Sequence, residues 1–278
     1  MRQALETNVA KHYGRGGLAK SILEGLEKTG ADLDALTPED LAPVDEFHTA
    51  GRVTTVKAFE LTPLRAGMHV IDVGCGIGGA ARCMAREHRC RVTGVDLTPE
   101  YIDVARMLTE MTRLTDVCTF EQASALDLPF DDASFDAGVS FHAAMNIEDR
   151  AQFYGELARV LRRSAPLCIF DVMKGPAPGM IYPVPWAETA TTSFLKSSAE
   201  TKSLLEAAGF GIEKEENLRA FAIDYFRKVF ETAATAGGPP SLGLHLLTGA
   251  NAAEKFGNYL KACEAHQIEP VILVAQRR

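Results

Sequence analysis

Short apolar runs alternate with helical patterns of apolar residues through most of the chain. After residue 98, for example, Ile102, Ala105 and Leu108 recur at the spacing of one helix face. The apolar runs have the length of buried strands, and we expect seven of them, at residues 70–73, 92–95, 118–121, 136–141, 167–172, 210–216 and 271–275. This alternation predicts an α/β fold with a doubly wound, mainly parallel, seven-stranded sheet.

Three segments depart from the alternation. Residues 1–67 are predicted to form an N-terminal helical cover, because apolar residues recur there at helical spacing and Thr37 is suited to cap a helix. Residues 174–198 contain several prolines and form a loop, and residues 218–268 form a helical insertion between the last two strands. We expect both to be lid segments of one domain at 68–278. The insertion is alternatively a contact between the two copies of a homodimer.

A glycine-rich turn follows the first predicted strand. Gly74, Gly76 and Gly79 match the dinucleotide pattern G-x-G-x-x-G, in which the backbone turns sharply and approaches a ligand closely. The helix after the turn directs free N–H groups at that ligand. Asp72 lies two residues before the first glycine, where a carboxylate would repel a pyrophosphate. It would instead accept a hydrogen bond from an ammonium group, such as that of S-adenosylmethionine (SAM).

Composition limits the range of functions. The chain has 278 residues and a formal net charge of −8, which disfavours a surface that tracks nucleic-acid phosphates. None of the six cysteines forms a C-x-x-C pair, so we expect reduced thiols, no bound metal and a cytoplasmic protein. No apolar run approaches the length that spans a bilayer, and a membrane partner is not expected.

The chain resembles the class I SAM-dependent methyltransferases over residues 68–173. Three features in order carry the resemblance: Asp72-x-Gly74-x-Gly76-x-Gly78, Asp96 at the end of the next apolar run, and the stretch at residues 126–136. The resemblance implies a Rossmann-like methyltransferase fold, SAM as cofactor and S-adenosyl-L-homocysteine as product. It also implies a small-molecule acceptor.

The resemblance further implies which residues contact the cofactor. Asp96 corresponds to the acid that binds both ribose hydroxyls. Ser124 stands where the family has an acid that binds the adenine amine, and this departure leaves a hydroxyl in place of a charge. The implied cofactor-binding residues are Tyr13, Thr49, Asp72, Gly74, Gly76, Asp96, Leu97, Ser124, Ala125 and Ser140.

A narrower resemblance is to the methyltransferase type 11 group, and within it to sarcosine/dimethylglycine N-methyltransferase-like proteins. It is carried by residues 47–52, 182–187 and 192–195. Relatives acting on such amines often carry Asp and His where this chain has His142 and Asn146. The acceptor is therefore an amine such as sarcosine or dimethylglycine, another N- or O-nucleophile, or a quinone, sugar or polyketide methylated on carbon or oxygen.

Methyl transfer from a sulfonium depends mostly on alignment and exclusion of water, and needs a base only when the nucleophile arrives protonated. His142 follows the fourth strand and is the candidate base, or alternatively a structural histidine. Tyr182, also assigned to catalysis, lies on the loop expected to cover the substrate. The candidate substrate-binding residues are Arg52, Asn146, Trp186 and His245. For Arg52 the alternative is a surface salt bridge, and for His245 it is core packing.

Two functions of other classes compete. An NAD(P)-dependent oxidoreductase fits the glycines and Asp96, but Asp72 and the lack of a Tyr-x-x-x-Lys pair oppose it. A SAM-binding protein without catalytic activity would carry the same cofactor residues.

Overall fold

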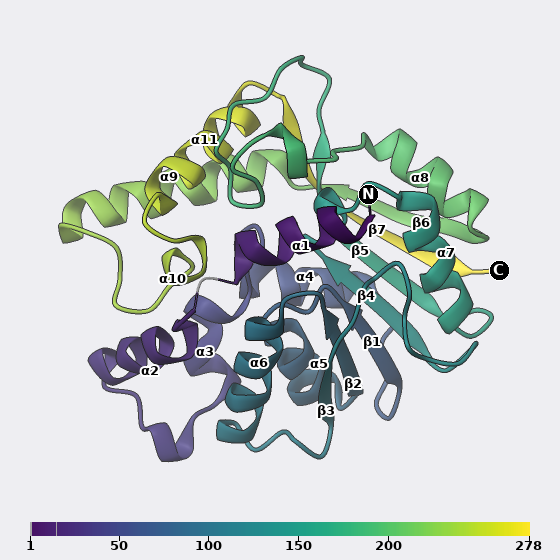
Figure 1. The fold of residues 1–278 in the computed structure, drawn as a ribbon, viewed down its shortest axis with the longest axis horizontal. Helices are drawn as coiled ribbons and strands as arrows, with labels where there is room; N and C mark the ends of the chain where they lie inside the picture. Colours follow the sequence, from purple (N-terminus) through teal and green to yellow (C-terminus); the bar gives the residue numbers. More distant parts are fainter. Residues whose placement is uncertain (1, 15) are drawn as a thin grey trace.

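The computed structural model describes residues 2–14 and 16–278, and the strands in these residues form one seven-stranded sheet (Figure 1). The strand order is β3-β2-β1-β4-β5-β7-β6. The strands are β1 (His69–Val73), β2 (Arg91–Asp96), β3 (Cys118–Gln122), β4 (Ala137–Phe141), β5 (Pro166–Lys174), β6 (Phe210–Asn217) and β7 (Ile268–Arg277). Neighbouring strands from β3 to β5 pair in parallel, whereas β7 is antiparallel to both β5 and β6. The predicted α/β fold is therefore confirmed, with the last strand longer than expected.

Helices cover both faces of the sheet. The helices are α1 (Arg2–Tyr13), α2 (Leu18–Thr29), α3 (Pro38–Asp45), α4 (Arg52–Leu61), α5 (Gly79–His88), α6 (Pro99–Met111), α7 (Arg150–Val160), α8 (Ser198–Ala207), α9 (Arg219–Ala236), α10 (His245–Thr248) and α11 (Ala252–Glu264). Helices α4, α5 and α6 pack against one face through a buried apolar cluster, and α7 and α8 pack against the other. The strands bury alternate residues into the two clusters, as expected when both faces are covered.

Local signals in the sequence account for two helix starts. Thr37 caps α3, with its hydroxyl accepting from the backbone N–H of Asp40 and the Asp40 carboxylate accepting from that of Thr37. Ser197 and Glu200 form the same reciprocal arrangement at the start of α8. Each pair satisfies two backbone N–H groups that the first helical turn leaves free.

The N-terminal helices and the insertion share a third apolar cluster. Leu18, Ile22 and Leu26 of α2 are buried in it, as their helical spacing predicts, together with Leu242 and Leu247 from the insertion. The insertion between β6 and β7 contains α9, α10 and α11, the green to yellow helices of Figure 1. The two helical segments therefore pack on each other as well as on the sheet.

Helix α1 differs from the other helices that cover the sheet, because none of its described residues is buried. Its side chains Leu5, Glu6, Val9 and Tyr13 face a cavity that is also lined by the carboxyl ends of β1, β2 and β4. The helix, dark purple in Figure 1, thus lies across the edge of the sheet where parallel strands usually bind ligands.

Candidate active site

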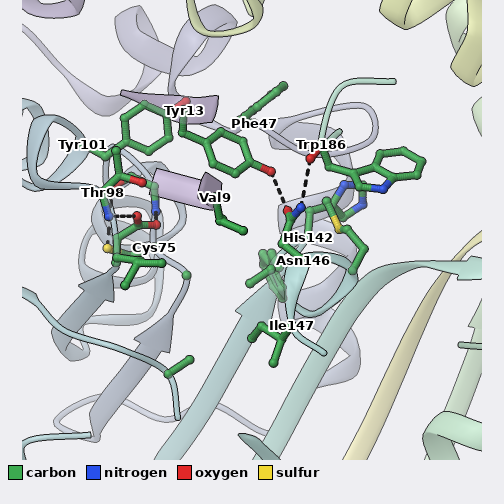
Figure 2. Close-up of a pocket in the computed structure, with 18 of the residues that line it drawn as sticks. Val9, Tyr13, Phe47, Cys75, Thr98, Tyr101, His142, Asn146, Ile147 and Trp186 are labelled. Carbon is green, nitrogen blue, oxygen red and sulfur yellow. Dashed lines mark hydrogen bonds between the residues drawn. The ribbon is translucent and has the colours of Figure 1, made fainter. Parts of the chain in front are cut away.

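A cavity of about 350 Å³ lies at the carboxyl ends of the parallel strands (Figure 2). Its floor comes from the residues that end β1, β2 and β4 and from the loop after β3. Its walls come from α1, the segment at 45–49, the loop at 185–186, and side chains of the insertion. The volume is within the range of small-molecule and cofactor sites.

Two glycines in the turn after β1 are required for different reasons. Gly74 has φ +82°, and a Cβ there would lie 2.3 Å from the Cβ of Ala143, so a side chain would collide with the loop after β4. Gly76 has φ +54°, and a Cβ there would have no protein atom within 4 Å. Because Gly76 lines the cavity, that open space is available to a ligand.

Asp72 places a buried carboxyl at the floor of the cavity. Its side chain is 1% exposed, and in the described part of the chain its Oδ2 has no hydrogen-bond partner. Burial, followed by the nearby carboxylates of Asp96 and Glu46, raises the pKa of Asp72 to about 7. A buried polar atom without a donor is costly unless a ligand supplies one. A cationic group such as the ammonium of SAM fits this position.

Asp96 is held in place by two backbone amides. Its Oδ2 accepts from the N–H of Gly76 at 3.0 Å, and its Oδ1 accepts from the N–H of Thr98 at 2.8 Å. Burial raises the pKa of Asp96, although these two bonds act in the opposite direction. Each oxygen retains a second lone pair, so the carboxylate is oriented to accept from two adjacent hydroxyls of a ligand.

The loop after β3 meets helix α1. The hydroxyl of Ser124 donates to Oε1 of Glu6 at 2.6 Å, and Arg2 donates to Ser124 Oγ through its Nη2 at 3.2 Å. The Nε of Arg2 also donates to Oε1 of Glu6, at 3.2 Å. All three side chains line the cavity. A carboxylate from the N-terminal helix is thus brought to the serine that replaces the expected acid.

The end of the cavity beyond β4 contains a chain of polar side chains. His142 has φ +49°, and its Nε2 lies 3.4 Å from Oγ1 of Thr49, which is 2.6 Å from the hydroxyl of Tyr259. The enclosure of the imidazole, followed by the charge of nearby His48, lowers the pKa of His142 well below its usual value of about 6.5. The ring is therefore neutral near pH 7, with one of its two nitrogens unprotonated.

Asn146 connects three parts of the wall. Its Oδ1 accepts from the hydroxyl of Tyr13 at 2.7 Å, and its Nδ2 donates to the carbonyl of Trp186 at 2.9 Å, the two dashed lines that meet at Asn146 in Figure 2. The same Nδ2 donates to the carbonyl of Thr192 at 2.8 Å. Asn146 therefore joins α1 to the loop that covers the cavity.

Most of the residues expected from the sequence line this one cavity. They are Tyr13, Thr49, Asp72, Gly74, Gly76, Asp96, Leu97, Ser124, Ala125, His142, Asn146 and Trp186. Because carboxyl ends of parallel strands meet at one edge of the sheet, residues far apart in the sequence converge there.

Four expected site residues do not line the cavity. The hydroxyl of Ser140 donates to the carbonyl of Val73 at 2.7 Å and so connects β4 to β1. Arg52 pairs with the buried carboxylate of Glu46, which is the salt bridge considered as its alternative, although one that is largely buried. Tyr182 packs beside the apolar cluster of the lid, and His245 begins α10. In this arrangement, none of these four side chains would touch a ligand bound in the cavity.

Several lining residues were not expected from the sequence. Glu6 lies on a helix without a marked apolar face, and its partner Ser124 is 118 positions away. Four more belong to the insertion: Phe226, Leu244, Phe256 and Tyr259. The sequence indicates helices in the insertion, but helical spacing does not show which of its faces meets the sheet.

In residues 2–14 and 16–278, no three His, Cys, Asp or Glu side chains are grouped so as to hold a metal ion. Within the same residues, no helix has both the length and the apolar character needed to cross a membrane.

Known proteins match both the sequence and the fold. The model of a methyltransferase domain family matches residues 71–169. An O-methyltransferase of Pyrenophora dematioidea is 31% identical over 214 residues, which cover 76% of this chain and 78% of that protein. An O-methyltransferase of Penicillium expansum is 31% identical over 223 residues, 78% of each chain.

A solved structure extends the likeness in fold to nearly the whole chain. It is the geranyl diphosphate C-methyltransferase from Streptomyces coelicolor A3(2), in complex with Mg²⁺, geranyl-S-thiolodiphosphate and S-adenosyl-L-homocysteine. The TM-score is 0.72 at 17% identity, with 99% of this chain and 98% of that chain covered.

The sheet order and the glycine turn define a Rossmann-like α/β fold of the methyltransferase type. The chain belongs to the class I SAM-dependent methyltransferases. It is an enzyme of small-molecule methylation that uses SAM and releases S-adenosyl-L-homocysteine. The oxidoreductase alternative is excluded by this membership.

Proposed function

We propose that the protein methylates a hydroxyl oxygen on an uncharged, largely apolar small molecule, with His142 as the base. The observation that carries the proposal is the lining of the cavity beyond β4. Its apolar members are Phe141, Met145, Trp186, Phe226, Leu244 and Phe256. Its polar members are His48, Thr49, His142, Asn146 and Tyr259, together with Glu46, whose carboxylate is already paired with Arg52 and with His48. Among the described residues that line the cavity there is no Lys, and the one Arg, Arg2, bonds Ser124 at the loop after β3.

The cofactor is proposed to lie along the edge of the sheet. Asp72 is the next-to-last residue of β1, Asp96 ends β2, and Ser124 follows β3, and these three strands are neighbours in the order β3-β2-β1. Neighbouring strands are about 4.8 Å apart, so the three side chains are spread over roughly 10 Å. Asp72 would hold the ammonium group, Asp96 would hold the ribose hydroxyls, and the loop at Ser124 would hold the adenine ring. When bound, SAM supplies an electrophilic methyl group on a sulfonium.

The residues beyond β4 position and deprotonate the acceptor. In the tautomer of His142 whose Nε2 donates to Oγ1 of Thr49, its Nδ1 is the nitrogen that takes the proton from the acceptor hydroxyl. As the new O–CH₃ bond forms, the S–CH₃ bond breaks and its electron pair stays on sulfur. Thr49 and Tyr259 fix the imidazole, and the aromatic wall excludes water.

An amine acceptor of the sarcosine or dimethylglycine type is the second candidate, supported by the narrower sequence resemblance. Its carboxylate would need a cation beside it, and Arg52, the residue expected to supply one, does not line the cavity and is paired with Glu46. The apolar lining therefore favours the hydroxyl acceptor.

Isotope-labelled SAM and a panel of acceptors test the proposal. The panel contains phenols and polyketide-type alcohols, with dimethylglycine and phosphoethanolamine as the charged comparison. We expect label transfer to a hydroxyl compound, and a fall in kcat of about 100-fold or more in His142→Ala with SAM affinity retained. His88→Ala, which changes a histidine on α5 away from the cavity, is the matched control. Transfer to the charged amines alone, or full activity of His142→Ala, would contradict the proposal.

A further inference from the structure

We infer that Glu6, on the N-terminal helix, is the residue that recognises the exocyclic amine of the cofactor's adenine. The inference uses the same cofactor site as the proposed function and does not depend on the identity of the acceptor. Glu6 lines the cavity, is partly exposed, and accepts from Ser124 Oγ at 2.6 Å. Ser124 and Glu6 therefore form one polar group, built from two distant parts of the chain.

The Glu6 carboxylate retains capacity to bind a donor in the cavity. In the described part of the chain, the bonds from Ser124 and from Arg2 both end on Oε1 of Glu6. Its Oε2 takes part in neither bond and keeps both lone pairs. Arg2 also donates to Ser124, so the serine and the acid are held together by a third side chain.

The position of Glu6 along the cavity selects the part of the cofactor that it meets. Asp72 fits the ammonium and Asp96 fits two adjacent hydroxyls, and they lie at the carboxyl ends of neighbouring strands β1 and β2. Continuing from β1 through β2, the next position is the loop after β3, which therefore faces the adenine ring. The adenine of SAM carries an amine with two N–H donors, and a carboxylate is the strongest acceptor for such a donor.

This contact makes the N-terminal helix part of the cofactor site. Helix α1 has no buried residue, and its described polar contacts to the rest of the molecule include Glu6 with Ser124 and Tyr13 with Asn146. The adenine amine meets the carboxylate of Glu6 only while α1 lies on the cavity. Cofactor binding and the docking of α1 therefore strengthen each other.

The test compares two ligands that differ at the amine. Isothermal titration calorimetry measures the affinity of S-adenosyl-L-homocysteine and of S-inosyl-L-homocysteine, which has a carbonyl oxygen in place of the amine. We expect the protein to prefer the adenosyl ligand by roughly 10- to 100-fold, because a carboxylate bonds the amine and repels the carbonyl. In Glu6→Gln the preference should fall by about tenfold or more, since the amide also donates to a carbonyl.

Glu24→Gln is the matched control, because it makes the same change on α2, where Glu24 pairs with Lys20 on the surface. Glu24→Gln should prefer S-adenosyl-L-homocysteine over S-inosyl-L-homocysteine as strongly as the natural protein does. Equal weakening of both ligands in Glu6→Gln would show that Glu6 only docks the helix, and unchanged affinities would show no contact; either result overturns the inference. Failure of the protein to bind S-adenosyl-L-homocysteine at all would overturn the cofactor site itself, which is a separate outcome.

Discussion

The carboxyl of Asp72 provides the sharpest test of the site, because its ionisation links folding to cofactor binding. It is buried, its Oδ2 has no partner in the described part of the chain, and burial raises its pKa to about 7. The ordinary value is about 3.9, and the difference corresponds to roughly 4 kcal/mol for holding the charged form without a ligand beside it. The perturbation is Asp72→Asn, which removes the charge with little change of shape.

The sign of the effect on stability follows from the direction of the pKa change. The folded protein binds the Asp72 proton more tightly than the unfolded chain does. The contribution of this group to the free energy of unfolding is therefore complete below about pH 4 and is lost as the pH rises to about 7. In Asp72→Asn the side chain does not ionise, so the free energy of unfolding does not fall in this way as the pH rises. At pH 8 the variant without ligand should be more stable than the natural protein by about 2–4 kcal/mol, and at pH 4 the two should be similar.

The affinity for the cofactor should change with pH in the direction opposite to the change in stability. A ligand ammonium beside Asp72 favours the carboxylate, so below pH 7 binding releases a proton and the affinity rises with pH up to about 7. Calorimetry at pH 6 in buffers of different ionisation enthalpy measures that proton. Asp72→Asn should bind SAM at least about tenfold more weakly, and its binding of SAM should release correspondingly fewer protons. The reasoning fails if urea unfolding gives the same stability difference at pH 4 and pH 8, or if proton release is equal in both proteins.

Three further variants test other parts of the site. Gly76→Val should abolish SAM binding by calorimetry at a cost of about 1–2 kcal/mol in stability, because its side chain enters open cavity space at positive φ; normal binding would contradict the cofactor position. Asp45→Ala should lower the free energy of unfolding by about 3–5 kcal/mol, because it leaves the guanidinium of Arg82 buried without its acid; a loss under 1 kcal/mol would show the pair to be unimportant. Trp186→Leu should lower kcat/KM for the acceptor while SAM affinity stays within about tenfold; equal losses in both would place Trp186 against the cofactor.

The fold and the convergence of Asp72 and Asp96 on one cavity were predictable because both depend on short-range patterns. Apolar runs mark strands buried on both faces, and the residue that ends each parallel strand lies at the binding edge. Asp72 and Asp96 end such runs, so their convergence follows from the order of the strands.

The part of the cavity beyond β4 was less predictable because tertiary packing decides which side chains line it. Nothing near Arg52 in the sequence shows that Glu46 is buried and turns back to meet it. Tyr259 reaches Thr49 across 210 positions, from a helix whose inward face is decided by its packing on α9. Helix α1 buries no residue, so it lacks the apolar pattern that would have marked Glu6 as a neighbour of Ser124.

The close approach of α3 to α5 bears on how this chain could be recombined with its relatives. The carbonyl oxygen of Asp45 lies 2.2 Å from the point where a Cβ on Gly79 would stand, and the Asp45 carboxylate pairs with fully buried Arg82. If residues 1–67 were replaced by the corresponding segment of a relative, that segment would have to pack its backbone directly against Gly79. It would also have to supply an acid to pair with Arg82. The cover and the sheet domain are therefore expected to vary together through descent, as one unit of inheritance rather than two exchangeable modules.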